Sequence, residues 1–249
     1  MKMPDRDVIV ACDFKSKGQV SEFLELFGGE RPFLKIGMEL FYAEGPELVR
    51  FLKKRGHRIF LDLKLHDIPH TVSRAMSVLS SLGADMCNVH AAGTEEMMRA
   101  ALEGLTRPDG TRPLLIAVTQ LTSTSEERMR RDLLIERPMT EVVRHYAQTA
   151  KRAGLDGVVC SPLEASEVHA ACGEGFITVT PGVRFADGDA GDQVRVATPE
   201  RARVLGSDFI VVGRPITQAA DPVAAWHRCV REFVNEQAAQ PHLVSREQA

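Results

Sequence analysis

Eight short apolar runs are spaced along the chain, and each is nearly continuous rather than alternating between apolar and polar residues. Continuous runs of this length are typical of parallel strands that are covered on both faces. The pattern predicts strands at residues 8–12, 33–37, 59–65, 86–90, 114–118, 157–160, 177–180 and 209–212.

Amphipathic stretches separate these runs and begin or end with residues typical of helix termini. They predict helices at 20–27, 46–55, 71–82, 94–105, 140–153, 163–172 and 198–205, and a last helix that opens at Asp221-Pro222. Thr198-Pro199 and Asp221-Pro222 each pair a capping side chain with proline at the first helical position. Eight alternating units predict an α/β fold, a single-domain (β/α)8 TIM barrel over residues 1–236, followed by a polar tail, 237–249, that we expect to fray.

Two segments depart from this alternation. Residues 106–112 form a polar turn for which the sequence indicates no role. Residues 183–195 are rich in glycine and aspartate and have no periodicity, which predicts a long mobile loop after the seventh strand. Long loops in compact domains usually serve function.

Composition narrows the class of protein. The chain has 249 residues, 44% of them hydrophobic, and a net charge of -3, so no basic surplus suggests nucleic acid and nothing suggests a membrane. The five cysteines are scattered without a CxxC pair, and the N-terminal residues contain no apolar stretch long enough for a signal peptide. We therefore expect reduced thiols and a cytoplasmic location.

Charged residues gather where the first three predicted strands end, which is the end of a barrel that carries the active site. Asp62 and Lys64 are two residues apart and share one face of their strand, and Asp67 follows at the turn. Asp13 and Lys35 stand at or near the ends of the first two strands. The barrel mouth is therefore predicted to hold two lysines against three aspartates.

This charge pattern indicates a reaction class. A lysine flanked by carboxylates keeps its ammonium form, so Lys64 can act as a general acid. A substrate anion placed beside Asp62 would be repelled, and the repulsion would end when it leaves as carbon dioxide. The pattern suits decarboxylation, although the spacing alone equally allows proton transfer beside a carbonyl group.

The seventh and eighth strands are followed by a second pattern, Pro181-Gly182-Val183-Arg184 and Gly213-Arg214. Glycine lets backbone amides approach an anion, and arginine offers paired donors to phosphate oxygens. These two loops are the usual phosphate site of barrel enzymes. The alternative is that both arginines are solvated surface charges.

His66, His70 and His90 lie near the aspartates but lack the spacing of known metal-binding motifs. A structural role is expected for each of them.

The stretch from Asp62 to Thr71, DLKLHDIPHT, closely resembles the signature of the orotidine 5′-phosphate decarboxylase family, bacterial branch. The resemblance spans residues 7–230 and includes LKIGMELFYAEGP, NVHAAGTEEMM, AVTQLTSTS, GLDGVVCSPLE, TVTPGVRF, GDQVRVATPE and IVVGRPIT. It implies decarboxylation of orotidine 5′-phosphate to uridine 5′-phosphate in de novo pyrimidine biosynthesis. It also implies a cytoplasmic homodimer that uses no metal and no organic cofactor.

The resemblance further assigns roles to residues of the barrel mouth. It implies that Lys64 protonates C6 of the pyrimidine and that Asp62 lies against the departing carboxylate. Asp13 and Lys35 match ribose-contacting positions, and Lys35 also joins the Lys-Asp array.

Other matched positions bind the rest of the substrate or reach the partner subunit. Asp67 and Thr71 match residues that family members contribute across the dimer interface, and Thr122 matches the hydroxyl that reads the pyrimidine edge. The resemblance places the phosphate beside these residues of the last two loops: Pro181, Arg184, Gln193, Gly213 and Arg214. It also implies that Gln193 can bridge phosphate and base and that the 187–192 segment closes as a lid.

Two alternatives remain open on the sequence. A magnesium-dependent sugar-phosphate decarboxylase or aldolase of the same barrel superfamily would share the Asp-x-Lys-x-x-Asp strand, and a magnesium requirement would identify it. A non-catalytic sensor of phosphate ligands would need no proton donor, so the intact Lys64 array argues against it.

Overall fold

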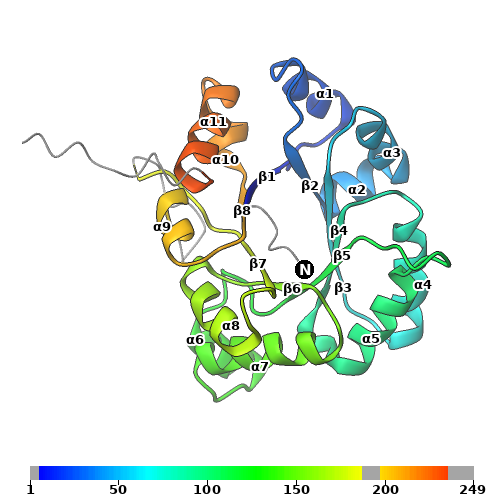
Figure 1. Ribbon diagram of the computed structural model, residues 1–249, viewed down its shortest axis with the longest axis vertical. Helices are drawn as coiled ribbons and strands as arrows, with labels where there is room; N and C mark the ends of the chain where they lie inside the picture. The colour runs from blue at the N-terminus through cyan, green and yellow to red at the C-terminus, as the bar shows by residue number, and fades with distance from the viewer. Residues whose placement is uncertain (1–5, 187–196, 235–249) are drawn as a thin grey trace, which may run out of the picture.

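The fold is seen in a computed structural model that describes residues 6–186 and 197–234 (Figure 1). Eight parallel strands pair in sequence order and close into a barrel, with β8 beside β1. The strands are β1 Asp7–Ala11, β2 Phe33–Gly37, β3 Ile59–Leu65, β4 Met86–His90, β5 Leu114–Val118, β6 Gly157–Val159, β7 Ile177–Thr180 and β8 Phe209–Val212. The TIM-barrel prediction is confirmed.

Helices surround the barrel on its outer side (Figure 1). They are α1 Lys17–Glu25, α2 Met38–Glu44, α3 Pro46–Lys54, α4 Pro69–Ser80, α5 Thr94–Leu105, α6 Glu126–Leu133, α7 Met139–Arg152, α8 Ala165–Cys172, α9 Pro199–Val204, α10 Arg214–Thr217 and α11 Pro222–Phe233, with short 3-10 turns η1 Ala91–Gly93 and η2 Pro162–Glu164. Within the described ranges, no helix is long and apolar enough to cross a membrane.

The structure confirms two predicted helix starts and contains three helices that the sequence did not predict. The side chains of Thr198 and Asp221 cap α9 and α11 as predicted, accepting hydrogen bonds from backbone N–H groups in the first turn. The helices α2, α6 and α10 were not predicted, and each buries a single residue. The helix α6, EERMRRDL, buries only Met129, and α10 is a single turn. The 237–249 tail lies outside the described residues.

The core has two layers because strand side chains alternate between the barrel interior and the surrounding helices. The inner layer contains Ile9, Ala11, Phe33, Phe60, Met86, Ile116, Ile177, Val179, Phe209 and Val211. The larger outer layer joins the other strand face to the helices. Two residues beyond Ala11, Phe33, Phe60 and Met86 come Asp13, Lys35, Asp62 and Asn88. The inner rows thus turn polar where the strands end.

Aspartates close the opposite end of the barrel in a repeated arrangement. Asp85, Asp156 and Asp208 each precede an even-numbered strand and accept a backbone N–H from the start of the preceding odd-numbered strand, at 2.7 to 2.8 Å. Each also contacts a basic side chain. The three groups are Asp85 with Ile59 and Lys53, Asp156 with Leu115 and Arg112, and Asp208 with Thr178 and His169.

The turn at 106–112, for which the sequence indicated no role, joins this end of the molecule to α4. Arg107 Nη2 donates to the carbonyl oxygen of Ser80 at 2.7 Å. Since the last carbonyl groups of a helix have no partner within it, the turn satisfies one of them.

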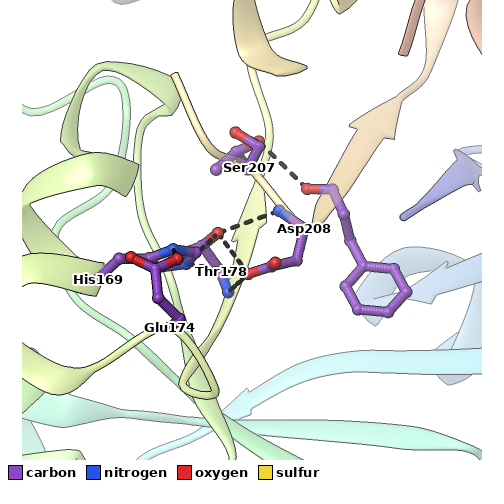
Figure 2. Close-up of polar contacts among 7 residues, drawn as sticks. His169, Glu174, Thr178, Ser207 and Asp208 are labelled. Atoms are coloured by element: carbon purple, nitrogen blue, oxygen red, sulfur yellow. Dashed lines mark hydrogen bonds and ion pairs between the residues drawn. The ribbon is translucent and has the colours of Figure 1, made fainter. Parts of the chain in front are cut away.

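The Asp208 group, drawn in Figure 2, is the most buried of the three. The His169 ring is 7% exposed and lies between two carboxylates, with Nε2 at 3.1 Å from Asp208 and Nδ1 at 3.2 Å from Glu174. Thr178 Oγ1 also donates to Asp208, at 2.9 Å. The hydrogen bond to Asp208 raises the pKa of His169, with Glu174 adding to the effect and burial opposing it.

Replacing His169 should therefore change how stability depends on pH. A group whose pKa is raised on folding stabilises the fold below its ordinary pKa and loses that contribution as pH rises through the raised value. His169→Gln should lower the free energy of unfolding by about 2 kcal/mol at pH ~5.5, and the difference from the parent protein should shrink by pH ~9. Urea unfolding at fixed protein concentration measures this, and a difference that does not vary with pH would contradict the assignment.

Candidate active site

Four charged side chains meet at the C-terminal ends of β1, β2 and β3. Lys35 Nζ lies 3.1 Å from Asp13 Oδ1 and 3.5 Å from Asp62 Oδ2. Lys64 Nζ lies 2.6 Å from the other Asp62 oxygen, Oδ1. The charges thus alternate in sign along the row Asp13, Lys35, Asp62, Lys64, which we call the Asp-Lys array.

Burial makes the pairing within this array strong. Burial alone would raise the pKa of Asp62, but the neighbouring Lys35 and Lys64 lower it below its ordinary value. Burial would likewise lower the pKa of Lys35, and Asp62 and Asp13 raise it overall. Both central groups are therefore held in their charged forms, as buried charges require when they are paired.

Asp67 lies outside the array. The residue is exposed, and its carboxylate accepts the N–H of Ile68 at 2.6 Å. The strand ends at Leu65, and Asp67 lies in the turn before Pro69, the first residue of α4. The two lysines therefore meet two aspartates within this chain, not the predicted three. Thr71, in the first turn of α4, is exposed as well.

The backbone at Lys64 has an unusual conformation. Its φ angle is +50°, in the left-handed region that favours glycine. The pairing of β3 with β4 also shifts register here, so that Asp62, Leu63 and Lys64 lie opposite Asn88 alone. Lys64 therefore lies at an irregular point of the strand.

Asn88 is a site residue that reasoning from the sequence missed. Its Nδ2 donates to Asp62 Oδ1 at 2.7 Å, and its Oδ1 accepts the Lys64 backbone N–H at 2.8 Å. A signal was present, since Asn88 is a polar residue between the apolar Cys87 and Val89, two residues after the inward-facing Met86.

A cavity of ≈ 240 Å³ opens beside the array. Lys35, Asp62 and Lys64 line one side, and the inner-layer residue Phe60 contributes to its apolar surface. The remaining lining comes from the ends of β5 to β8: Val118, Gln120, Leu121, Thr122, Ser123, Val159, Cys160, Pro181 and Val211. Two of these residues, Thr122 and Pro181, were predicted to bind substrate. The shape offers an apolar slot with charges along one wall.

The predicted phosphate residues follow the neighbouring strands β7 and β8. A Cβ atom at Gly213 would lie 3.8 Å from Asp13 Oδ2, so this loop approaches the array. Arg184 Nη1 donates to the carbonyl oxygen of Val183 at 2.8 Å, and Arg214 opens α10 with an exposed side chain. Gln193 and the 187–192 segment lie outside the described residues.

The histidines near the mouth were expected to be structural. The rings of His66 and His90 are 5.6 Å apart, and burial, followed by His66 and Lys64, lowers the pKa of His90. Among the residues that the structure describes, no group of three or more His, Cys, Asp or Glu is arranged to hold a metal ion.

A closed β/α barrel with paired lysines and aspartates beside a cavity at the C-terminal ends of its strands has the architecture of a barrel enzyme. The chain belongs to the Orotidine 5'-phosphate decarboxylase / HUMPS family, which it matches over residues 6–229.

Individual relatives agree with this membership. The chain is 58% identical to orotidine 5'-phosphate decarboxylase of Bacillus cereus (strain Q1) over 224 residues, which cover 89% of this chain and 94% of that protein. A crystal structure of orotidine 5'-phosphate decarboxylase from Lactobacillus acidophilus is 43% identical, with a TM-score of 0.82 over 92% of this chain and 99% of that one. An uncharacterized conserved protein from Geobacillus kaustophilus is 51% identical, with a TM-score of 0.81 over 91% and 99% of the two chains.

Replacing Asp62 should destabilise the protein more than replacing Asp13, because the two aspartates of the array differ in burial. The Asp62 side chain is 13% exposed and pairs with both lysines, whereas that of Asp13 is 64% exposed. Asp62→Asn should lower the free energy of unfolding by about 3 kcal/mol because it leaves buried cations unpaired. Asp13→Asn should cost less than about 1 kcal/mol. Urea unfolding at fixed protein concentration compares the two variants. Equal losses in the free energy of unfolding would show that the burial of Asp62 does not determine its contribution to stability.

Proposed function

We propose that this chain decarboxylates orotidine 5′-phosphate to uridine 5′-phosphate and carbon dioxide, a step of de novo pyrimidine biosynthesis. Family membership and the names of the relatives support the reaction. The observation that carries the proposal to this site is the Lys64 ammonium group held 2.6 Å from Asp62 on the wall of the cavity.

The chemistry follows from the positions of these two charges. The pyrimidine ring enters the apolar slot with its carboxylate beside Asp62, where two negative groups repel each other. The bond between C6 and the carboxylate breaks, carbon dioxide leaves, and the electron pair remains on C6. The Lys64 ammonium supplies the proton to this carbon, and solvent then restores it. Fixed charges that favour the transition state over the bound substrate are an effective source of catalysis.

The remaining substrate groups bind along the mouth. Asp13 and Lys35 bind the ribose, and Thr122 reads the edge of the pyrimidine. Residues of the loops after β7 and β8 bind the phosphate: Pro181, Arg184, Gln193, Gly213 and Arg214. Binding energy from the phosphate then helps to hold the ring in its strained position.

The chain acts as a cytoplasmic homodimer without metal or organic cofactor, and Asp67 and Thr71 serve the partner's site. Two features of the structure support this arrangement. Asp67 is exposed and outside the array of its own chain. Its neighbour Ile68 is 65% exposed, and Leu121, on the cavity lining, is 44% exposed. An incoming Asp67 would restore the excess of carboxylates that the sequence predicted.

The reaction is tested by following the absorbance of orotidine 5′-phosphate mixed with the protein in excess chelator. Loss of the orotate band with formation of uridine 5′-phosphate is expected. Lys64→Ala should lower kcat by about 10³-fold or more, because it removes the proton donor. Lys54→Ala, which removes an exposed lysine of α3, should not change it. Turnover that needs magnesium and a sugar phosphate instead would identify the related barrel enzymes.

The shared site is tested by mixing two inactive variants, Lys64→Ala and Asp67→Asn. A mixed dimer has one site with both defects and one with neither, so random exchange of subunits should restore up to about a quarter of the parent activity. Mixing Lys64→Ala with Asp62→Asn is the control, because both defects lie in the same chain's array and no intact site forms. Equal results for the two mixtures would contradict a contribution of Asp67 across the interface.

A further inference from the structure

Asn88, on β4, joins the two catalytic residues of β3 through its side chain. The residue is 1% exposed. Its Nδ2 donates to Asp62 Oδ1, the same oxygen that accepts from Lys64 Nζ. Its Oδ1 accepts the backbone N–H of Lys64. One carboxamide therefore binds the main chain of the proton donor and the carboxylate that holds its ammonium group.

This carboxamide does what the sheet cannot do at this point. Cys87 pairs with Leu61 and Val89 with Leu65, so the regular ladder between β3 and β4 is interrupted from Asp62 to Lys64. A left-handed Lys64 is also disfavoured by its own side chain. The carboxamide oxygen accepts as a peptide carbonyl oxygen does and supplies a partner for the Lys64 N–H, while the N–H donor of the same group binds the Asp62 carboxylate.

We propose that Asn88 is a positioning residue: its carboxamide holds Lys64 in the left-handed conformation and aligns Asp62, so that the ammonium group points into the cavity. The inference rests on the proposed function for its effect on turnover. A neutral amide fits the role because it donates to Asp62 without adding charge to the array. Leucine would leave the Lys64 N–H without its acceptor and would remove one of the donors to Asp62, and an ionised aspartate would repel Asp62.

The first test is Asn88→Leu, which has a similar size and no polar atoms. Misalignment of the proton donor should lower kcat by about 10²-fold while KM changes by less than about threefold, because binding elsewhere is untouched. Ser80→Ala is the control: it removes another buried hydrogen bond, 2.7 Å to Leu105 on the helix layer, and should leave kcat unchanged. A kcat within about threefold of the parent for Asn88→Leu would overturn the proposal.

The second test is Asn88→Asp, which keeps the shape and remains useful if the leucine variant does not fold. The carboxyl group that this substitution introduces lies against Asp62 and Lys64 of β3. Lys35 of β2 pairs with the same Asp62, and His90 of β4, next to His66, interacts with Asp62 and Lys64. In its neutral form the new carboxyl group can donate to Asp62 as the amide did, and in its ionised form it cannot. The ratio of the variant kcat to the parent kcat should therefore rise as pH falls. A ratio independent of pH would overturn the proposal.

A third measurement needs no substrate, so it separates this inference from the proposed function. Hydrogen exchange at the Lys64 amide should accelerate by at least about tenfold in Asn88→Leu, which lacks the acceptor, and stay slow in Asn88→Asp. The Leu115 amide, bound to Asp156, is the internal reference. If the parent protein does not turn over orotidine 5′-phosphate, the function is wrong and exchange alone decides the role of Asn88. Unchanged exchange in Asn88→Leu would overturn it.

Discussion

The site depends on one buried carboxylate that faces two ammonium groups. Asp62 receives Lys35 on one oxygen and Lys64 on the other. Each charge is tolerated at this depth only because the next one compensates for lost solvation. Rigidity follows from the same compensation, since none of the central groups can move without leaving another unpaired. A fixed field of this kind is already in place before any substrate arrives.

The barrel separates stability from chemistry along its axis. Apolar side chains fill the inner layer, aspartates tie adjacent strands together at the N-terminal ends, and the Asp-Lys array occupies the C-terminal ends. The two polar ends use the same residue type differently. At the base, an aspartate bridges the main chain and a basic side chain within the fold, as Asp208 does (Figure 2). At the mouth, Asp62 and its partners line open space.

Much of the fold and part of the site could be predicted, because burial leaves a strong pattern of apolar residues in the sequence. Strands covered on both faces are continuously apolar, and β2, β3, β4, β5, β7 and β8 have the bounds that their runs predict. A lone charge at the end of such a run is equally visible, which located Asp13 and Lys35. The helix α6 buries only Met129, so few apolar positions mark it in the sequence. The course of the chain at Asp67 depends on a register shift and a left-handed residue, neither of which a local pattern records.

The aspartates at the base also divide the barrel into parts. They join β3 to β4, β5 to β6 and β7 to β8, always from the even-numbered strand to the odd-numbered one before it. We infer that each such pair, with its helices, can form as a local unit, because short loop closures cost less chain entropy. The pairing of β8 with β1 instead joins the two ends of the barrel and closes its longest loop. It also brings Gly213 beside Asp13 and completes the mouth.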